Sequence, residues 1–357
     1  KWLFVIARNS SFAYKGRAVD VKQAGRGLGV RHVLEGSLRK ASDRVRITCQ
    51  LIETASGTHV WAERYDRPLG DIFALQDEIT LSVVGAIEPS LRRAEIARAK
   101  RKRPENLDAY DLYLRALPHA QIAMPGDSEK ALEWLHRSLA LEPDYAAAHA
   151  LAAWFYEQRY LRGGMHEADR TAGLNHARAA LRAGADDPTT LATAGFVIGL
   201  VEHDYQTAMN AIDHALALNG SSTLALGLGA TILAHDGQIA RAIELGERAL
   251  RLSPHDLMAY LPLTALGIAH LAAGRFEEAA AACNKACQSN PHFSFPVVLQ
   301  TAALSGLGRV NEAKALVRRV LELQSPFSVA EFIRSYTGRA EIWNPIGEAL
   351  RQVGLPD

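Results

Sequence analysis

The chain has 357 residues, of which 48% are hydrophobic and 22% are charged, with 40 Lys and Arg against 39 Asp and Glu. This length allows two or three domains, and the formal net charge of +1 excludes binding of nucleic acid or acidic partners through overall charge. Three cysteines cannot all pair, and Cys49 lies far in sequence from Cys283 and Cys287, so we expect reduced thiols in a cytoplasmic protein.

The first seventy residues carry mixed strand and helix signals. The chain opens on Lys1 rather than Met, and we expect it to be part of a longer protein. Residues 2–7 predict a buried strand. Asp20, with Gln23 three residues later, resembles the capping box of a short helix that ends near Gly29. Glycines at 25, 27 and 29 fall at the end of that helix, whereas a phosphate-binding loop precedes one, so they indicate helix termination.

Three strands are predicted next. The first covers residues 33–39 and the third covers residues 58–65, with Val60 and Trp61 on opposite faces. Between them lies the clearest period-two alternation of the chain, in which apolar Val45, Ile47, Cys49 and Leu51 alternate with polar Arg46, Thr48 and Gln50. We therefore predict that residues 1–70 form an α+β domain with a mainly antiparallel sheet.

Residues 71–104 predict connecting helices. Asp71 can cap a helix with apolar positions at helical spacing, and Pro89 either kinks that helix or begins a second one. Residues 92–103 then carry seven basic residues and one acid, and Pro104 ends the segment. This basic stretch has three interpretations: a solvated helix end, a contact with phosphate or anionic lipid, or a contact that sets the angle between domains. We favour the first.

From residue 105 onward one helical signature recurs, a trio of small or apolar residues at spacing i, i+4, i+7. The four trios after residue 200 begin 34, 37 and 34 residues apart, which is the tetratricopeptide spacing of two helices per unit. They are Ala208, Ile212 and Ala215; Ala242, Gly246 and Ala249; Ala279, Cys283 and Ala286; and Ala313, Val317 and Val320.

Two earlier trios fit the same register. They are Ala131, Leu135 and Ser138, and then Gly173, Ala177 and Ala180, which follow about eight inserted residues in the range 163–171. We therefore predict about six tetratricopeptide-like repeats over residues 105–325, stacked into an all-α superhelical solenoid. Residues 326–357 depart from the repeat, and their aromatic and aliphatic positions predict capping helices over the last apolar face.

The first helices of such an array line a concave groove that binds extended peptides or helices. Alignment from the trios places five residues near this surface, namely Trp154, Glu157, Phe196, Thr231 and His235. Aromatic side chains there would anchor a protein or peptide partner. The alternative is that Trp154 and Phe196 belong to the core.

The other motifs favour packing over chemistry. The sequence His166-Glu167 lacks the second histidine of a zinc protease, and Cys283 with Cys287 lacks further ligands and occupies a packing position. Residues 257–274 lack charge but contain Pro262 where the repeat requires a first helix, so we do not expect a membrane span. We expect no catalytic residue, cofactor or metal in this chain, and neither a nucleic-acid nor a membrane contact.

Three stretches carry a resemblance to a known bacterial architecture: LFVIARNSSFAYKGRAVDVKQAGRGLGVRHVLEGSLRK, RVRITCQLIETASGTHVWAERYD and DIFALQDEIT. They resemble the TolB amino-terminal-like domain that is joined to tetratricopeptide repeats carboxy-terminal to many class III adenylate cyclases. Here the strand and helix that usually precede residue 2 are absent, so the domain looks truncated and we expect its sheet to expose an edge. Gly27 stands where the family usually has an acidic residue.

The resemblance implies a non-catalytic regulatory region whose output domain, an adenylate cyclase, lies upstream. Similar pairs of domains also follow winged-helix domains, so a transcriptional regulator is one alternative. A free-standing adaptor is another. In each case we expect a protein or peptide to bind in the repeat groove. A second copy of the chain, in a homodimer, is a further candidate partner.

Overall fold

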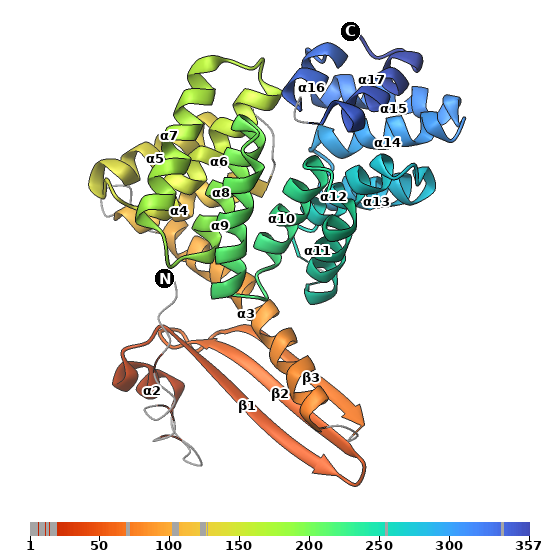
Figure 1. The fold of residues 1–357 in the computed structure, drawn as a ribbon. Coiled ribbons are helices and arrows are strands. Elements are labelled where there is room, and N and C mark those ends of the chain that lie inside the picture. Colours follow the sequence, from red (N-terminus) through yellow and green to blue (C-terminus); the bar gives the residue numbers. More distant parts are fainter. Residues whose placement is uncertain are drawn as a thin grey trace. The chain divides into compact units, whose positions relative to one another are not determined.

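The computed structural model describes residues 20–68, 72–101, 107–121, 128–253, 256–336 and 339–357, together with residues 6, 11, 14 and 126. The chain divides into two compact units, Lys1–Arg98 and Ala99–Asp357 (Figure 1). The strand expected at residues 2–7, apart from residue 6, and the cap expected at Asp71 lie outside the described residues.

The short helix of the first unit, α2 (Val21–Leu28), is the one expected from its capping residue. The Asp20 side chain accepts a hydrogen bond of 2.8 Å from the backbone N–H of Lys22. Gly29 ends the helix with a φ of 67°, a left-handed conformation that glycine adopts without steric cost. Gly29 therefore terminates the helix, as predicted, whereas Gly25 and Gly27 lie inside it.

The sheet of the first unit is an antiparallel meander of β1 (His32–Ala41), β2 (Arg44–Glu53) and β3 (His59–Pro68). Leu51 of β2 pairs with Leu34 of β1 and with Trp61 of β3. The alternation predicted for the middle strand is confirmed on its apolar face, where Val45 and Tyr65 pack with Ile79 and Val83 of the helix α3 (Ile72–Arg101).

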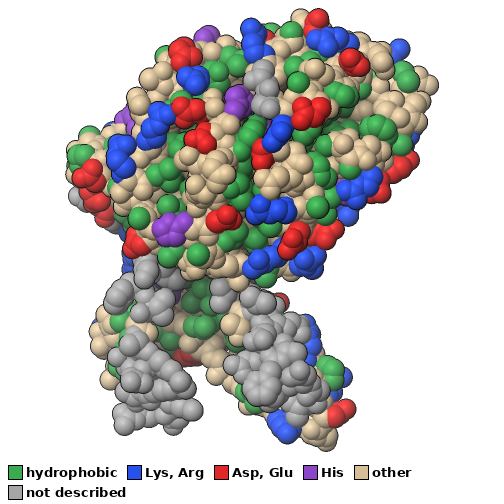
Figure 2. Space-filling model, in the orientation of Figure 1, with side chains coloured by type: hydrophobic (Ala, Val, Ile, Leu, Met, Phe, Trp, Pro, Cys, Tyr) green, Lys and Arg blue, Asp and Glu red, His purple; other side chains and the backbone are tan. Residues whose placement is uncertain are grey.

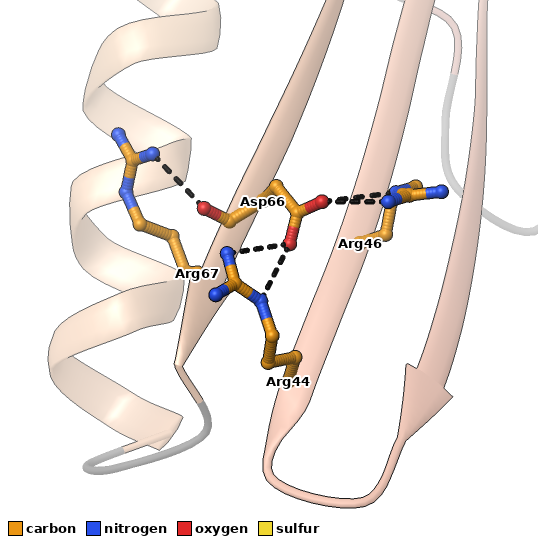
Figure 3. A network of polar contacts seen from close by, with 4 residues as sticks. All are labelled: Arg44, Arg46, Asp66 and Arg67. Carbon is orange, nitrogen blue, oxygen red and sulfur yellow. Dashed lines mark hydrogen bonds and ion pairs between the residues drawn. The ribbon is translucent and has the colours of Figure 1, made fainter.

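The opposite face of the sheet is polar. The Asp66 carboxylate accepts hydrogen bonds from Arg46 at 2.7 and 3.2 Å and from Arg44 at 3.1 Å, while Arg67 donates to the Asp66 carbonyl (Figure 3). These hydrogen bonds, from Arg46 first and then Arg44, hold the pKa of Asp66 below its usual range. The sheet thus has one face packed under a helix and one face of paired charges.

Helix α3 runs without interruption through Pro89 and the basic stretch. Of the two alternatives at Pro89, a separate second helix is therefore wrong, and residues 72–101 form one helix. Some of the basic side chains lie beside groups of their own unit: Arg93 donates to Ser90, and Arg98 pairs with Glu95 at 3.1 Å.

The second unit consists of helical pairs followed by a closing pair (Figure 1). The first three pairs are α4 (Ala109–Ala116) with α5 (Ser128–Leu141), α6 (Ala146–Arg162) with α7 (Glu167–Ala183), and α8 (Pro188–Glu202) with α9 (Tyr205–Leu218). The next three are α10 (Thr223–His235) with α11 (Ile239–Leu252), α12 (Tyr260–Ala272) with α13 (Phe276–Ser289), and α14 (Ser294–Gly306) with α15 (Val310–Leu323). The closing pair is α16 (Val329–Ser335) and α17 (Ala340–Gln352).

Small residues at the trio positions allow the two helices of a pair to approach closely. In the pair α12 and α13, a Cβ placed on Gly267 would lie 2.4 Å from the Sγ of Cys283, so only a glycine fits there. Cys283 itself is fully buried, with an unpaired thiol, as a small packing residue would be.

The second pair differs from its sequence-based description. The extra residues expected as an insertion at 163–171 instead lengthen both helices. The first helix α6 has 17 residues whereas α10, α12 and α14 have 13, and the second helix α7 has 17 whereas α9, α11, α13 and α15 have 14. The connection between α6 and α7 stays short. The insertion therefore adds about one turn to each helix and leaves the repeat register of the later pairs intact.

The apolar stretch 257–274 forms α12, the first helix of its pair, with Pro262 in the first turn, where proline is tolerated. Nowhere in the described part of the chain is a helix both long and apolar enough to cross a bilayer.

We expect residues 105–357, produced alone, to unfold in one cooperative transition at a temperature close to that of the same helices in the full chain. The reason is that each helical pair buries its apolar face against the neighbouring pairs of the same unit. Circular dichroism at 222 nm during heating, with the full chain as the control, measures this. A broad, non-cooperative melt would contradict the expectation.

Candidate partner-binding face

The five residues predicted to line the groove lie on the first helices α6, α8 and α10, and we call the surface that they form the inner face. In the structure all five are buried, with exposed fractions between 1% and 5%. They are Trp154, Glu157, Phe196, Thr231 and His235. The inner face is therefore covered in this structure, and each residue has its own contacts.

Trp154 and Phe196 join α6 to α8. Their rings are stacked with centroids 5.3 Å apart and an interplanar angle of 28°. Both side chains are almost fully buried, which is also what the core alternative predicts. The Nε1 of Trp154 has no hydrogen-bond partner among the described residues, so this aromatic pair carries one unsatisfied donor.

Thr231 and His235 occupy successive turns of α10. The Thr231 hydroxyl donates to the carbonyl of Gly227 at 3.0 Å, and the Nδ1 of His235 lies 2.8 Å from the carbonyl of Thr231. Because a carbonyl only accepts, Nδ1 must carry the proton, which leaves Nε2 as an acceptor. Nε2 has no partner within the described residues, and burial lowers the pKa of His235 to about 4.

Glu157 is one partner of a buried ion pair within α6. The Nη2 of Arg162 lies 3.3 Å from each Glu157 carboxylate oxygen, and the Gln158 amide donates to the same carboxylate at 2.5 Å. Arg162 also donates to the Gln158 side-chain oxygen. Burial raises the pKa of Glu157, and the Arg162 charge only partly opposes this. The pair therefore places a strongly desolvated carboxylate on the inner face.

Arg162 also reaches the later repeats. Its guanidinium lies 5.3 Å from the ring centroid of Phe293, at the start of α14. Tyr260, the first residue of α12, is fully buried, and its pKa is raised chiefly by burial, with Arg162 opposing and Glu157 adding to the shift. The tyrosine hydroxyl has no partner among the described residues. Residues far apart in sequence thus meet at the ion pair of α6.

The closing pair α16 and α17 covers the inner face at α10 and α14. The ring centroids of Tyr336 and Trp343 lie 5.3 and 5.0 Å from that of His235. The same two rings lie 5.1 and 6.2 Å from Phe295 of α14 and 4.7 Å from each other. Burial is also the largest cause of the raised pKa of Tyr336, which is further affected by Arg162 and Glu157.

Two polar contacts lie at the edge of this covered region. Arg339, just before α17, forms an ion pair of 2.8 Å with Asp236, the residue that caps α10. The Ser335 hydroxyl of α16 lies 3.3 Å from the Sδ of Met165, in the connection between α6 and α7. The closing pair therefore contacts the α6–α7 connection, α10 and α14, and not the last repeat alone.

The sequence did not predict that the closing pair contacts helices before the last repeat. The aromatic and aliphatic positions of residues 326–357, among them Tyr336 and Trp343, were expected to cover the last apolar face only. The predicted groove did not include Arg162, Tyr260 or Phe295, although Arg162 is five residues after Glu157 and a buried carboxylate needs a cation. The aromatic density of the closing pair was the available signal for a larger contact.

A histidine cluster lies elsewhere in the second unit, between α5, α6 and α7. The Nε2 of His149 donates to the Pro143 carbonyl at 2.8 Å, and in the neutral form of both rings its Nδ1 accepts from the Nδ1 of His176, also at 2.8 Å. His136 stacks against His176 and contacts the hydroxyl of Tyr156 at 3.1 Å. Burial, followed by the neighbouring histidines, lowers the pKa of His176 to about 4.

Across the part of the chain that the structure describes, no group of three or more His, Cys, Asp and Glu side chains is arranged to hold a metal ion. On the face drawn in Figure 2, basic and acidic side chains are intermixed over the helical repeats. That face of the repeats offers no extended single-sign surface of the kind that binds a polyanion.

Comparison with known proteins adds two findings. The tetratricopeptide repeat family matches residues 262–293, which contain most of α12 and all of α13. A protein of Rhizobium meliloti (strain 1021) named "Putative adenylate cyclase 3" is 49% identical over 148 residues, which are 42% of this chain. The aligned part is 25% of that relative, so the chain spans about a quarter of its length.

Solved structures show the same fold at low identity. A monomeric IFIT1 mutant with m7Gppp-AAAA superposes with a TM-score of 0.54 over 76% of this chain and 65% of its own, at 14% identity. The Cut9–Hcn1 hetero-tetramer of APC/C superposes with a TM-score of 0.51 over 74% of this chain and 48% of that chain, at 12% identity. The second unit is thus a tetratricopeptide-like helical solenoid, a protein-interaction fold.

Proposed function

We propose that this chain is the non-catalytic regulatory region of a bacterial signalling protein, and that its output domain is an adenylate cyclase upstream of it. The observation that carries the proposal is the 49% identity to a Rhizobium meliloti protein named for that activity, of which the chain spans a quarter. A region of that size leaves most of the relative for a catalytic domain. As part of the same proposal we assign the sheet unit to the TolB amino-terminal-like type, supported by its antiparallel meander under α3.

We further propose that the inner face of the repeats binds a protein or peptide. Its support is the protein-interaction fold and the set of aromatic and charged side chains gathered there. Through this binding the region would favour one of two states of the attached cyclase, which requires that the partner contact the two states differently. A cytoplasmic location belongs to the same proposal.

The proposal is tested first by the intact mass of the native protein, captured from its source cells with an antibody against residues 105–357. We expect a mass well above the 38.8 kDa of this chain, and formation of cyclic AMP from ATP by the captured protein but not by this chain alone. A mass near that of this chain would overturn the proposal in favour of a free-standing adaptor. A larger protein with a winged helix and no cyclase activity would overturn it in favour of a transcriptional regulator.

A further inference from the structure

The inner face already has an occupant in this structure, which is the closing pair α16 and α17. Repeat packing requires a closing element only on the last pair, α14 and α15. The closing pair also contacts earlier helices. Tyr336 and Trp343 lie against His235 of α10, and Ser335 contacts Met165 in the α6–α7 connection. The closing pair therefore covers the inner face around His235.

The occupant has the chemistry of an amphipathic helical ligand. Its inward side chains are aromatic and aliphatic: Phe332, Tyr336, Trp343, Ile346 and Leu350 are all buried. Its outward positions are polar, since Glu331, Arg334 and Glu348 are exposed. Aromatic anchors on one side of a helix are what a helix-binding groove recognises.

The fit of this occupant is incomplete in its polar groups. Where the two surfaces meet, the Nε2 of His235 and the Nε1 of Trp343 are buried without a hydrogen-bond partner among the described residues, and so is the hydroxyl of Tyr260 at the start of α12. The Nε of Arg162 is likewise buried without a hydrogen-bond partner among the described residues. These groups belong to both surfaces, so a ligand with a donor for His235 and acceptors for Arg162 and Tyr260 would match the inner face better.

The pair is held at its edge by a contact that is open to water. In the ion pair between Arg339 and Asp236, the side chains are 44% and 18% exposed. An ion pair at such a position contributes little to stability. The closing pair is joined to α15 through the short segment 324–328, so the chain connection itself does not hold the pair on the inner face.

We infer that the inner face is a binding site for an amphipathic helix with aromatic anchors, and that α16 and α17 occupy it as an intramolecular ligand that the partner must displace. This inference rests on the proposed binding function of the inner face. Displacement makes the apparent affinity of the partner equal to its intrinsic affinity multiplied by the fraction of chains with an open face. Weakening the closing pair should therefore strengthen binding in trans.

The closing pair itself supplies a probe, a fluorescein-labelled peptide of residues 326–357, whose binding to the full chain is followed by fluorescence anisotropy. In the variant Arg339→Asp the chain's own closing pair is repelled by Asp236, while the peptide keeps its arginine. We expect the peptide to bind this variant several-fold more tightly than the unaltered chain, because the ion pair is lost and two like charges face each other in its place. The double variant Asp236→Arg/Arg339→Asp restores the internal ion pair and repels the peptide, so its binding should fall to or below the level of the unaltered chain.

Arg251→Asp is the matched control, because it makes the same change of charge at an exposed position of α11, outside the closing pair, where Arg251 pairs with Glu247. It should leave peptide binding unchanged. A second variant, Trp343→Ala, removes an anchor from the closing pair and should also increase binding. The inference is overturned if neither Arg339→Asp nor Trp343→Ala binds the peptide more tightly than the unaltered chain. Since the peptide assay involves no cyclase, its failure is distinguishable from a failure of the proposed output domain.

Discussion

Replacing Arg162 with methionine is expected to lower the free energy of unfolding of the chain by about 3–5 kcal/mol, the usual cost of removing one partner of a buried ion pair. The arginine side chain is 6% exposed and that of Glu157 is 1% exposed, so the carboxylate would be left without a cation or water. Burial already raises the pKa of Glu157, and without Arg162 the group should take up a proton. Urea unfolding followed by circular dichroism measures the loss.

Two further variants make this expectation specific. The double variant Glu157→Gln/Arg162→Met should recover most of the loss, because it removes the buried charge together with its partner. Arg251→Met is the matched control, since Arg251 pairs with Glu247 on the surface of α11, where the two side chains are 66% and 55% exposed. It should cost less than about 1 kcal/mol. An Arg162→Met variant as stable as this control would contradict the account of the buried pair.

The second large effect is acid destabilisation by two buried histidines. Burial lowers the pKa of both His176 and His235 from 6.5 to about 4. Below pH 6.5 the unfolded chain takes up protons that the folded chain does not, so stability is complete above pH 6.5 and is lost as the pH falls toward 4. Each histidine should remove about 1.4 kcal/mol per pH unit within this window.

The groups that face each histidine are known. His149 and His136 lie beside His176, with Tyr156 stacked against it. His235 is packed against Phe295, Tyr336 and Trp343, and His203 is the other titratable group that lowers its pKa. No carboxylate is among the causes of either shift, so protonation of these rings is not compensated.

The measurement is the urea midpoint at pH 7, 6 and 5. His176→Gln and His235→Gln should each make the midpoint less dependent on pH, and the double variant should do so more strongly. His214→Gln changes an exposed histidine of α9 and should leave the pH dependence as it is. If the unaltered chain is equally stable at pH 7 and pH 5, the histidines are not held neutral by the fold.

The regular parts of this fold were predictable because their causes are local. The alternation around Ile47 gave the middle strand, Gly29 gave the end of a helix, and the trios around Ile212 and Cys283 gave the repeated pairs. Each signal depends on residues within about ten positions of one another. Pro89 shows the limit of such reasoning, since a helix interrupted by proline and one that continues through it can share the same sequence pattern.

The contacts made at the inner face could not be predicted from local sequence patterns. Whether Trp343 reaches His235, more than a hundred positions earlier, depends on the curvature that accumulates over several repeats. The burial of Arg162 against Phe293 depends on the same curvature. Periodicity identifies which residues share a helix face, but small rotations between neighbouring pairs decide what lies opposite that face.

The close packing of α12 on α13 gives the chain a reporter of its own opening. The Cys283 thiol is fully buried against Gly267, and burial raises its pKa far above the range in which thiols react. An alkylating reagent in the solvent can modify this sulfur only when the two helices have separated. Its rate of labelling, read separately from that of Cys49 and Cys287, therefore follows the opening of the α12–α13 pair in the unaltered protein, without any engineered probe.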